Sequence, residues 1–257
     1  MGKTLIGDDV IKEDLYFFNG YGGFDNYSMS YKIKLRDFIT TPAPWINVIS
    51  NEDFGFHVSE SGSAYTWCQN SRENKVTSWS NDWIVDPLSE ALYIRDDGAG
   101  KYFSITPEPV RDEDVYDIEH GFGYSIFKHT ANNISGELTM FCPKDKKLKL
   151  CKVLLENKSL EGKGLTLFYY SSMVLGVYSY KSAKYISTNI EENFIYAQNP
   201  FNKYFYKNKT YLTILDCEAY GFREQLQDSM SLGILDSMAS LYDYWVYKIY
   251  WWLFRFN

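Results

Sequence analysis

The chain has 257 residues, a formal net charge of −7 and an aromatic content of 18 % that includes 23 tyrosines. This length supports one large domain, with or without an appendage. A domain of this size buries a core large enough for the chain to fold without disulfides. The acidic charge argues against a nucleic acid or an anionic membrane surface as a partner, because both require a basic face.

The cysteines and the N-terminus indicate a cytoplasmic protein with reduced thiols. The N-terminal residues lack the basic-then-apolar pattern of a signal peptide, and no apolar run approaches the length of a membrane span. The cysteines show no metal-binding or redox spacing and are expected to be free: they are Cys68, Cys142, Cys151 and Cys217.

From about Tyr31 to Leu215 the apolar residues recur with the period of β-strands. Tyr31–Leu35 (YKIKL) alternates, and Lys147–Leu155 (KLKLCKVLL) does so in part. The turn-prone run Asp96–Gly100 (DDGAG) separates two further strand-like segments, as in a hairpin. Many short strands without intervening helical patterns predict a mainly β, antiparallel sandwich.

Near Glu218 the period changes to three or four residues, which predicts a helix. This helix would either cover the sandwich or begin a helical domain. We therefore expect a β-domain over residues 1–217 and a C-terminal helical appendage over residues 218–257. The predicted helical stripe consists of Leu226, Met230, Ile234, Met238, Leu241, Trp245, Ile249 and Trp252.

The stretch from Thr41 to Asp86 places four tryptophans among Asn, Ser, Gly and Asp residues: Trp45, Trp67, Trp79 and Trp83. Aromatic faces stack on the C–H face of a sugar, while amides and carboxylates hydrogen-bond its hydroxyls. The same composition also suits ordinary long loops whose tryptophans plug the ends of a sandwich. Composition leaves both interpretations open.

Asp82 is the carboxylate in this stretch with a possible catalytic role. An inverting sugar transfer to phosphate needs one general acid, since phosphate requires no second protein base. The alternative is that Asp82 and Asp86 cap turns with their side chains. Phosphate-binding loops, a Gly-x-Ser-x-Gly elbow and zinc-ligand spacing are absent from the sequence.

Several blocks occur in an order that resembles one known family. They are DLYFFNGYGGF (14–24), TPAPWINV (41–48), FGFHVSESGSAYTW (54–67), NSRE (70–73), WSND (79–82) with DP (86–87), YIRD (93–96), TPEP (106–109) and HGFGY (120–124). The chain resembles the N-terminal part of glycoside phosphorylases of the cellobiose phosphorylase and cyclic β-1,2-glucan synthase group, which is glycoside hydrolase family 94, formerly glycosyltransferase family 36. The resemblance is strongest to the phosphorylase-like region of cyclic β-1,2-glucan synthases. It implies a galactose-mutarotase-like β-supersandwich, followed in the family by a helical linker, a catalytic (α/α)₆ barrel and a small β-domain.

The resemblance extends to Gly221–Asp228 (GFREQLQD), which is similar to a motif of an early barrel helix. By this resemblance Arg223, Glu224 and Asp228 help to hold the sugar whose bond is cleaved. Glu224 stands where the family usually has Asp, so its carboxylate would lie one methylene further out. The linker before this motif and the barrel after it, including the family's general acid, are not found, so a truncated or internally deleted chain is implied. Asp82 does not correspond to that acid.

These features predict a non-catalytic, sugar-associated sandwich domain of an inverting β-glucoside phosphorylase. The resemblance implies inorganic phosphate as co-substrate, α-glucose 1-phosphate as product, no metal or organic cofactor, and a homodimer. The expected ligand is a β-linked gluco-oligosaccharide, contacted by Arg72, Trp79 and Asp82. A stand-alone carbohydrate-binding module and a compact enzyme that uses Asp82 are the two alternatives.

Overall fold

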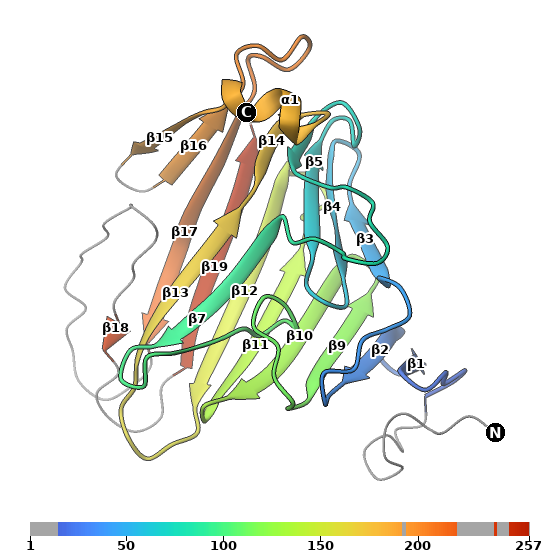
Figure 1. Ribbon diagram of the computed structural model, residues 1–257, viewed down its shortest axis with the longest axis vertical. Helices are drawn as coiled ribbons and strands as arrows, with labels where there is room; N and C mark the ends of the chain where they lie inside the picture. Colours follow the sequence, from blue (N-terminus) through green and yellow to red (C-terminus); the bar gives the residue numbers. More distant parts are fainter. Residues whose placement is uncertain (1–14, 192–193, 220–238, 241–246, 257) are drawn as a thin grey trace.

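The computed structural model describes residues 15–191, 194–219, 239–240 and 247–256, which form antiparallel β-sheets (Figure 1). The largest sheet has ten strands in the order β1-β2-β9-β10-β11-β12-β19-β17-β16-β15. Their bounds, in this order, are Gly22–Asp25, Ser30–Leu35, Tyr116–Gly121, Tyr124–Ala131, Ile134–Phe141, Leu148–Asn157, Tyr247–Phe256, Lys209–Ala219, Phe194–Gln198 and Ser187–Glu191.

Two smaller sheets complete the fold. One has the order β18-β13-β7-β8, with bounds Ala239–Ser240, Gly164–Ser171, Glu90–Asp96 and Lys101–Phe103. The other has the order β14-β6-β5-β4-β3, with bounds Met173–Gly176, Lys75–Thr77, Ala64–Cys68, Phe54–Ser59 and Ile46–Ser50. A short helix α1 (Ser179–Ser182) and a 3₁₀ turn η1 (Ala183–Tyr185) follow β14.

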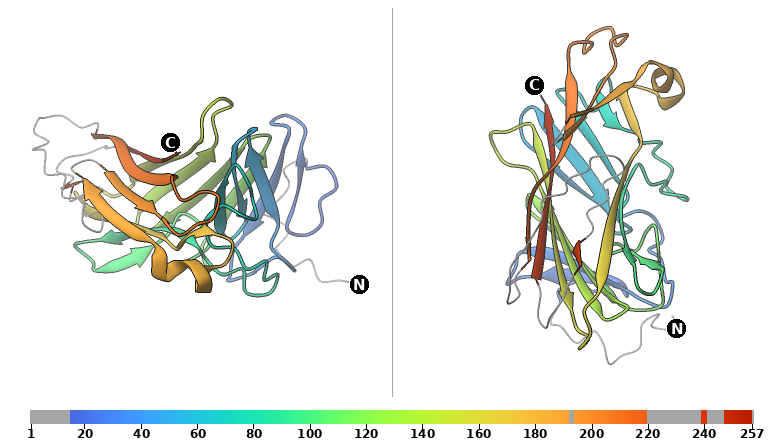
Figure 2. Two further views of the ribbon diagram at one scale, coloured as in Figure 1. Left: turned by 90° about the horizontal axis from the view of Figure 1, so that it is seen from above. Right: turned by 90° about the vertical axis from the view of Figure 1, so that its left-hand side faces the viewer.

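The sheets stack as a sandwich, and Figure 2 shows β19 (red) and β13 (gold) on opposite sides of it. Strands with one buried face explain the alternation in the sequence, because successive side chains of a strand point to opposite faces. In β10 and β11 the buried residues alternate with more exposed ones throughout. The shared core is contributed by all three sheets and includes Ile33, Phe56, Val58, Ile94, Phe127, Leu138, Val153 and Leu167.

The predicted hairpin turn at Asp96–Gly100 is confirmed. The carboxylate of Asp96 accepts the backbone N–H groups of Gly98 and Ala99 at 3.1 and 3.0 Å. Gly100 has a φ of +66°, a conformation that glycine adopts without steric cost. The side chain of Asp96 thus closes the turn between β7 and β8.

The strand predicted around Lys149 is confirmed as β12. At its start, however, the buried face is the one that the alternation of polar and apolar residues assigns to solvent. The apolar Leu148 and Leu150 are only half-buried, whereas Lys149 is fully buried among the core residues. The ammonium Nζ of Lys149 lies 2.5 Å from the carboxylate Oε2 of Glu90 on β7. Thr66 and Thr77 donate to the other oxygen of Glu90 at 2.6 and 2.7 Å.

This network joins strands of all three sheets. Lys149 lies on β12 of the ten-stranded sheet and Glu90 on β7 of the four-stranded sheet, while Thr66 and Thr77 lie on β5 and β6 of the five-stranded sheet. Burial alone would raise the pKa of Glu90, but Lys149 and the hydroxyl donors outweigh burial and lower the pKa. Glu90 is therefore an ionised carboxylate inside the sandwich, and it depends on its partners.

The prediction of a C-terminal helix is wrong for residues Tyr247–Phe256, which the structure describes. Residues Tyr247–Phe256 form strand β19, which pairs antiparallel with β12 on one side and β17 on the other. The segment YKIYWWLFRF is rich in aromatic residues that favour strands. In a run with so few polar residues, three-to-four spacing does not distinguish a helix from a buried strand. Residues 220–238 and 241–246, where the rest of that helix was predicted, lie outside the described residues.

Strand β17 spans Lys209–Ala219 and thus continues past the expected domain boundary at residue 217. No helix in the described part of the chain is long and apolar enough to cross a membrane.

Candidate carbohydrate-binding surface

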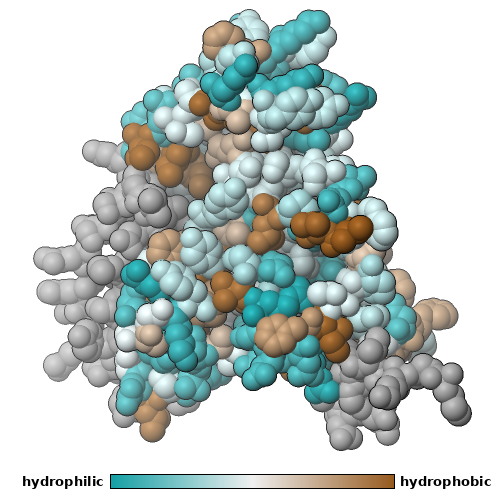
Figure 3. Space-filling model, viewed as in Figure 1, coloured by the Kyte–Doolittle hydropathy of each residue, from teal (hydrophilic) through white to brown (hydrophobic). Residues whose placement is uncertain are grey.

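The loop that joins β6 to β7, residues 78–89, is here called the Trp loop; Figure 1 shows it crossing the front of the sandwich. Figure 3 shows hydrophobic residues exposed over it. Trp83, Ile84 and Val85 are 66 %, 76 % and 68 % exposed. Residues of the Trp loop line two cavities.

Trp79 lies at the start of the Trp loop and packs against two other rings. Its indole stacks on Tyr65 at 5.1 Å between ring centroids with an interplanar angle of 8°. His57 meets the same indole edge-on at 4.9 Å and 84°. Trp79 remains 39 % exposed. The strand residues Tyr65 and His57 therefore fix an indole that still offers part of its surface to a ligand.

A cavity of about 310 Å³ adjoins Trp79. Its walls combine aliphatic groups with hydroxyls, which suits a ligand that has both C–H faces and hydroxyl groups. The lining residues are Ser78, Trp79, Ser80, Pro87, Val174, Val177, Tyr178, Ser179 and Tyr180.

A second cavity of about 570 Å³ is lined by residues 40–44, by residues 83–88 of the Trp loop and by four further residues. Its three buried or half-buried carboxylates are Glu60, Asp86 and Glu108, and all are already engaged. Glu108 pairs with Arg111 at 3.3 Å. Asp86 accepts the hydroxyls of Ser59 and Ser61 at 2.6 and 2.8 Å. Glu60 accepts the backbone N–H of Trp45 at 2.7 Å and the hydroxyl of Thr41, and burial raises its pKa. Asp86 and Glu60 thus hold loops in place.

Asp82 lines neither cavity. Its Oδ1 accepts the backbone N–H groups of Ile84 and Val85 at 3.0 and 2.9 Å, and these two bonds lower the pKa of Asp82. An exposed carboxylate with a lowered pKa stays ionised and has no proton to donate near neutral pH. The side chain of Asp82 closes a turn, which is the second of the two roles that the sequence left open.

Arg72 also lines neither cavity. It lies in the turn between β5 and β6 with its side chain 78 % exposed, and its Nε is 3.5 Å from Glu73. Arg223, Glu224 and Asp228 lie outside the described residues. Of the sugar contacts predicted from the sequence, Trp79 lines a cavity. All of these contacts, that of Trp79 included, stay predictions.

The sequence did not point to Tyr178, Ser179 and Tyr180, which line the same cavity as Trp79. They come to this place because β14 pairs with β6, with Met173 opposite Thr77. Two segments about one hundred residues apart in sequence thus build one cavity. No local motif marks such a pairing.

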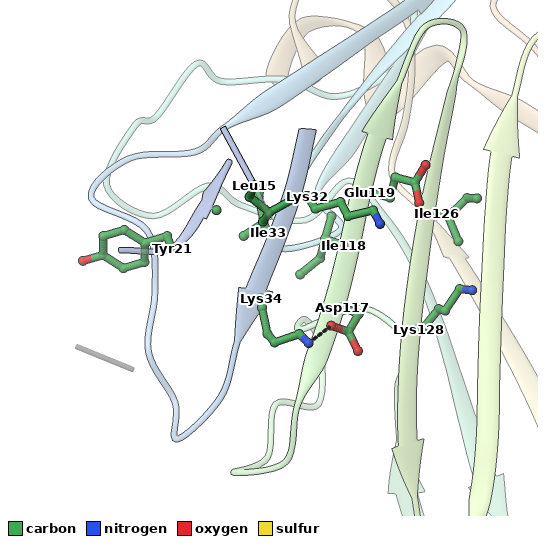
Figure 4. Close-up of a pocket in the computed structure, with 11 residues that line it drawn as sticks. Leu15, Tyr21, Lys32, Ile33, Lys34, Asp117, Ile118, Glu119, Ile126 and Lys128 are labelled. Atoms are coloured by element: carbon green, nitrogen blue, oxygen red, sulfur yellow. Dashed lines mark ion pairs between the residues drawn. The ribbon is translucent and has the colours of Figure 1, made fainter. Parts of the chain in front are cut away.

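A further cavity, of about 210 Å³, lies on the outer face of the large sheet (Figure 4). Its charged side chains already have partners: Lys34 pairs with Asp117 at 3.1 Å and Lys32 with Asp25 at 2.8 Å. Exposed pairs of this kind are typical of a solvated sheet face. Within the described residues, no group of three or more His, Cys, Asp or Glu side chains is placed to hold a metal ion.

Comparison with known proteins gives consistent results. Residues 29–225 match the family model of the glycosyl hydrolase 94 supersandwich domain. The chain is 36 % identical over 194 residues to the cyclic beta-(1,2)-glucan synthase NdvB of Rhizobium meliloti, covering 74 % of this chain and 7 % of the synthase. It is 33 % identical over 153 residues to the N,N'-diacetylchitobiose phosphorylase of Vibrio proteolyticus, covering 58 % of this chain and 19 % of that enzyme.

The 3-O-beta-D-glucopyranosyl-beta-D-glucuronide phosphorylase of Paenibacillus borealis is 22 % identical over 159 residues, which is 62 % of this chain and 19 % of that enzyme. This chain therefore spans a small part of the length of each of these relatives. The family model, in contrast, matches most of this chain. The chain belongs to the family of the glycosyl hydrolase 94 supersandwich domain.

Proposed function

We propose that this chain is a non-catalytic sandwich domain that binds a β-linked gluco-oligosaccharide at the cavity beside Trp79. The observation that carries the proposal is the partly exposed indole of Trp79, stacked on Tyr65 next to a cavity with hydroxyl-bearing walls. The relatives include a β-glucan synthase and a phosphorylase named for a β-linked glucosyl sugar, which supports a sugar of this class as the ligand.

The geometry favours binding by stacking. One face of a glucose ring presents C–H groups to the indole, while the hydroxyls at its edge reach Ser78, Ser80 and Ser179. Because Tyr65 and His57 already hold the indole, little side-chain entropy is lost when the sugar binds. Such a site supplies affinity and orientation without any acid or nucleophile.

The proposal assigns the bond-breaking chemistry to other parts of a larger protein. In the parent reaction, inorganic phosphate would attack a β-glucosidic bond to give α-glucose 1-phosphate, without a metal or organic cofactor. A general acid is needed for that step, and Asp82, Asp86 and Glu60 are each engaged in holding loops.

A homodimer and a cytoplasmic location belong to the same proposal. The free thiols of Cys68, Cys142 and Cys151 support the cytoplasmic location.

Removing the stacking ring tests the binding site. We expect β-1,2- or β-1,4-linked gluco-oligosaccharides to quench tryptophan fluorescence saturably. Trp79→Ala should weaken binding about tenfold, because an aromatic stacking contact contributes about 0.5–1.5 kcal/mol beyond the area that it buries, and 1.4 kcal/mol is tenfold in affinity. Trp83→Ala, which removes an exposed indole from the same loop, is the matched control and should bind like the unchanged chain. Equal affinity of Trp79→Ala and the unchanged chain would contradict the proposal.

Asp82→Asn tests the alternative of a compact enzyme. Asparagine keeps the side-chain oxygen that accepts the N–H groups of Ile84 and Val85, so the turn and the sugar affinity should be unchanged. We expect no release of glucose 1-phosphate from cellobiose or sophorose with phosphate, from either protein. Turnover by the unchanged chain that Asp82→Asn abolishes would establish the compact enzyme instead.

A further inference from the structure

Two segments at one end of the sandwich form a surface that we call the Tyr–Lys cap, residues 177–186 and 199–209. Figures 1 and 2 show α1 and the loop between β16 and β17 at this end. The rings of Tyr185 and Phe201 meet at 4.8 Å and join the two segments. The amides of Asn199 and Asn202 both donate to the carbonyl of Leu175, at 3.1 and 3.0 Å. The cap is therefore one continuous surface fixed to β14.

The cap is basic although the whole chain has a net charge of −7. It contains no Asp or Glu, and in the described part of the chain no carboxylate forms an ion pair with its lysines. These lysines are Lys181, Lys184, Lys203, Lys207 and Lys209. Their charge remains available to an anionic ligand.

Exposed rings lie between these lysines. Tyr180 is 76 %, Phe201 72 % and Tyr204 65 % exposed. The ammonium of Lys184 lies 4.9 Å from the ring centroid of Tyr185, and that of Lys203 lies 4.9 Å from Tyr204. A ligand on this surface would meet flat apolar faces and positive charges at alternate positions.

The cap also adjoins the cavity beside Trp79, because Tyr178, Ser179 and Tyr180 belong to both. The amide of Asn208 donates to Gln69 at 3.1 Å and ties the far end of the cap to the turn after β5. A sugar chain that leaves the cavity on this side would therefore run across the cap.

We propose that the Tyr–Lys cap binds the anionic groups of an acidic oligosaccharide whose neighbouring ring occupies the cavity beside Trp79. This inference rests on the proposed sugar site and extends it to the charge of the ligand. The rings of the cap stack on sugar faces, and the lysine ammoniums pair with the anionic groups as exposed point charges.

Single-stranded nucleic acid is the rival ligand, since it also uses stacking and positive charge. Two observations favour a short acidic sugar. The adjoining cavity offers mainly hydroxyl groups as its polar side chains. The net charge of −7 also repels a polyanion longer than the cap.

The test compares a β-1,4-linked glucuronic acid hexasaccharide with cellohexaose by isothermal titration calorimetry. Exposed ion pairs are individually weak, but a few of them together should make the acidic sugar bind about tenfold tighter at low salt. At about 0.5 M NaCl this difference should shrink, because the charges are screened.

The variant Lys184→Gln/Lys203→Gln/Lys207→Gln should remove the preference for the acidic sugar and leave cellohexaose binding unchanged. The control Lys101→Gln/Lys128→Gln/Lys158→Gln removes the same charge elsewhere and should keep the preference. The inference fails if both sugars bind equally, if the triple variant keeps the preference, or if oligo(dT)₁₂ binds more tightly than the acidic sugar. Trp79-dependent binding of cellohexaose without a preference would leave the proposed function intact. If neither sugar binds, both proposals fail.

Discussion

Replacing Lys149 by Met is expected to lower the free energy of unfolding by about 3–5 kcal/mol. Methionine fills a similar volume but leaves the Glu90 carboxylate without the ammonium that lies 2.5 Å from it. The carboxylate would then stay buried and would accept hydrogen bonds from the uncharged hydroxyls of Thr66, Thr77 and Tyr169 without a cation beside it. Urea unfolding at pH 7, followed by circular dichroism, measures the loss.

The double variant Lys149→Met/Glu90→Gln is the control. Glutamine retains an oxygen that can accept the threonine hydroxyls, while no charge is left unpaired. We therefore expect the double variant to be more stable than Lys149→Met alone, which is a coupling that a double-mutant cycle detects. A double variant whose loss equals the sum of the two single losses would show that the ion pair has no such role.

Acidification from pH 6.5 to 4 is expected to destabilise the fold through His57, which is buried, and His120, which is half-buried. Burial lowers the pKa of His57 to about 4, and the neighbouring Asp86 only partly opposes this effect. Burial likewise lowers the pKa of His120 to about 4. The unfolded chain has the ordinary histidine pKa near 6.5 and takes up these protons first, so stability is lost as the pH falls through this window.

Each histidine contributes a slope of up to about 1.4 kcal/mol per pH unit in this window, and up to about 3 kcal/mol in all. Urea unfolding curves at half-unit steps from pH 7 to 4 give the slope. His57→Gln and His120→Gln should each reduce the slope by about one proton. If neither variant changes the slope, the two imidazoles are protonated in the folded state and this account of them is wrong.

The sequence predicted the β-sandwich because its strands have one buried face, as in β10 and β11. It could not predict Lys149 in the core, since a lysine in an alternating strand is expected to face solvent. Its burial depends on Glu90, which lies 59 residues away in the sequence. The wrong prediction of a helix at the C-terminus has a related cause. The strand β19 is defined by its pairing with β12 and β17, and this pairing is a long-range contact.

The candidate site was predicted in part, for the same reason. The composition of the Trp-rich stretch left a sugar surface and loop packing both open, and Trp79 was named as a sugar contact only with the family resemblance. Neither identified Tyr178 and Tyr180, which strand pairing brings to the same cavity. The role of Asp82 depended on which N–H groups its carboxylate accepts, and this is set by the backbone of the Trp loop.

The most direct test of the account is an NMR titration of the chain labelled with ¹⁵N at its tryptophans, with the Trp79 indole signal assigned by Trp79→Phe. Addition of a β-linked gluco-oligosaccharide should shift that indole signal saturably, while the Trp83 signal moves little. A saturable shift of other tryptophans with an unchanged Trp79 signal, or no shift at all, would contradict the account.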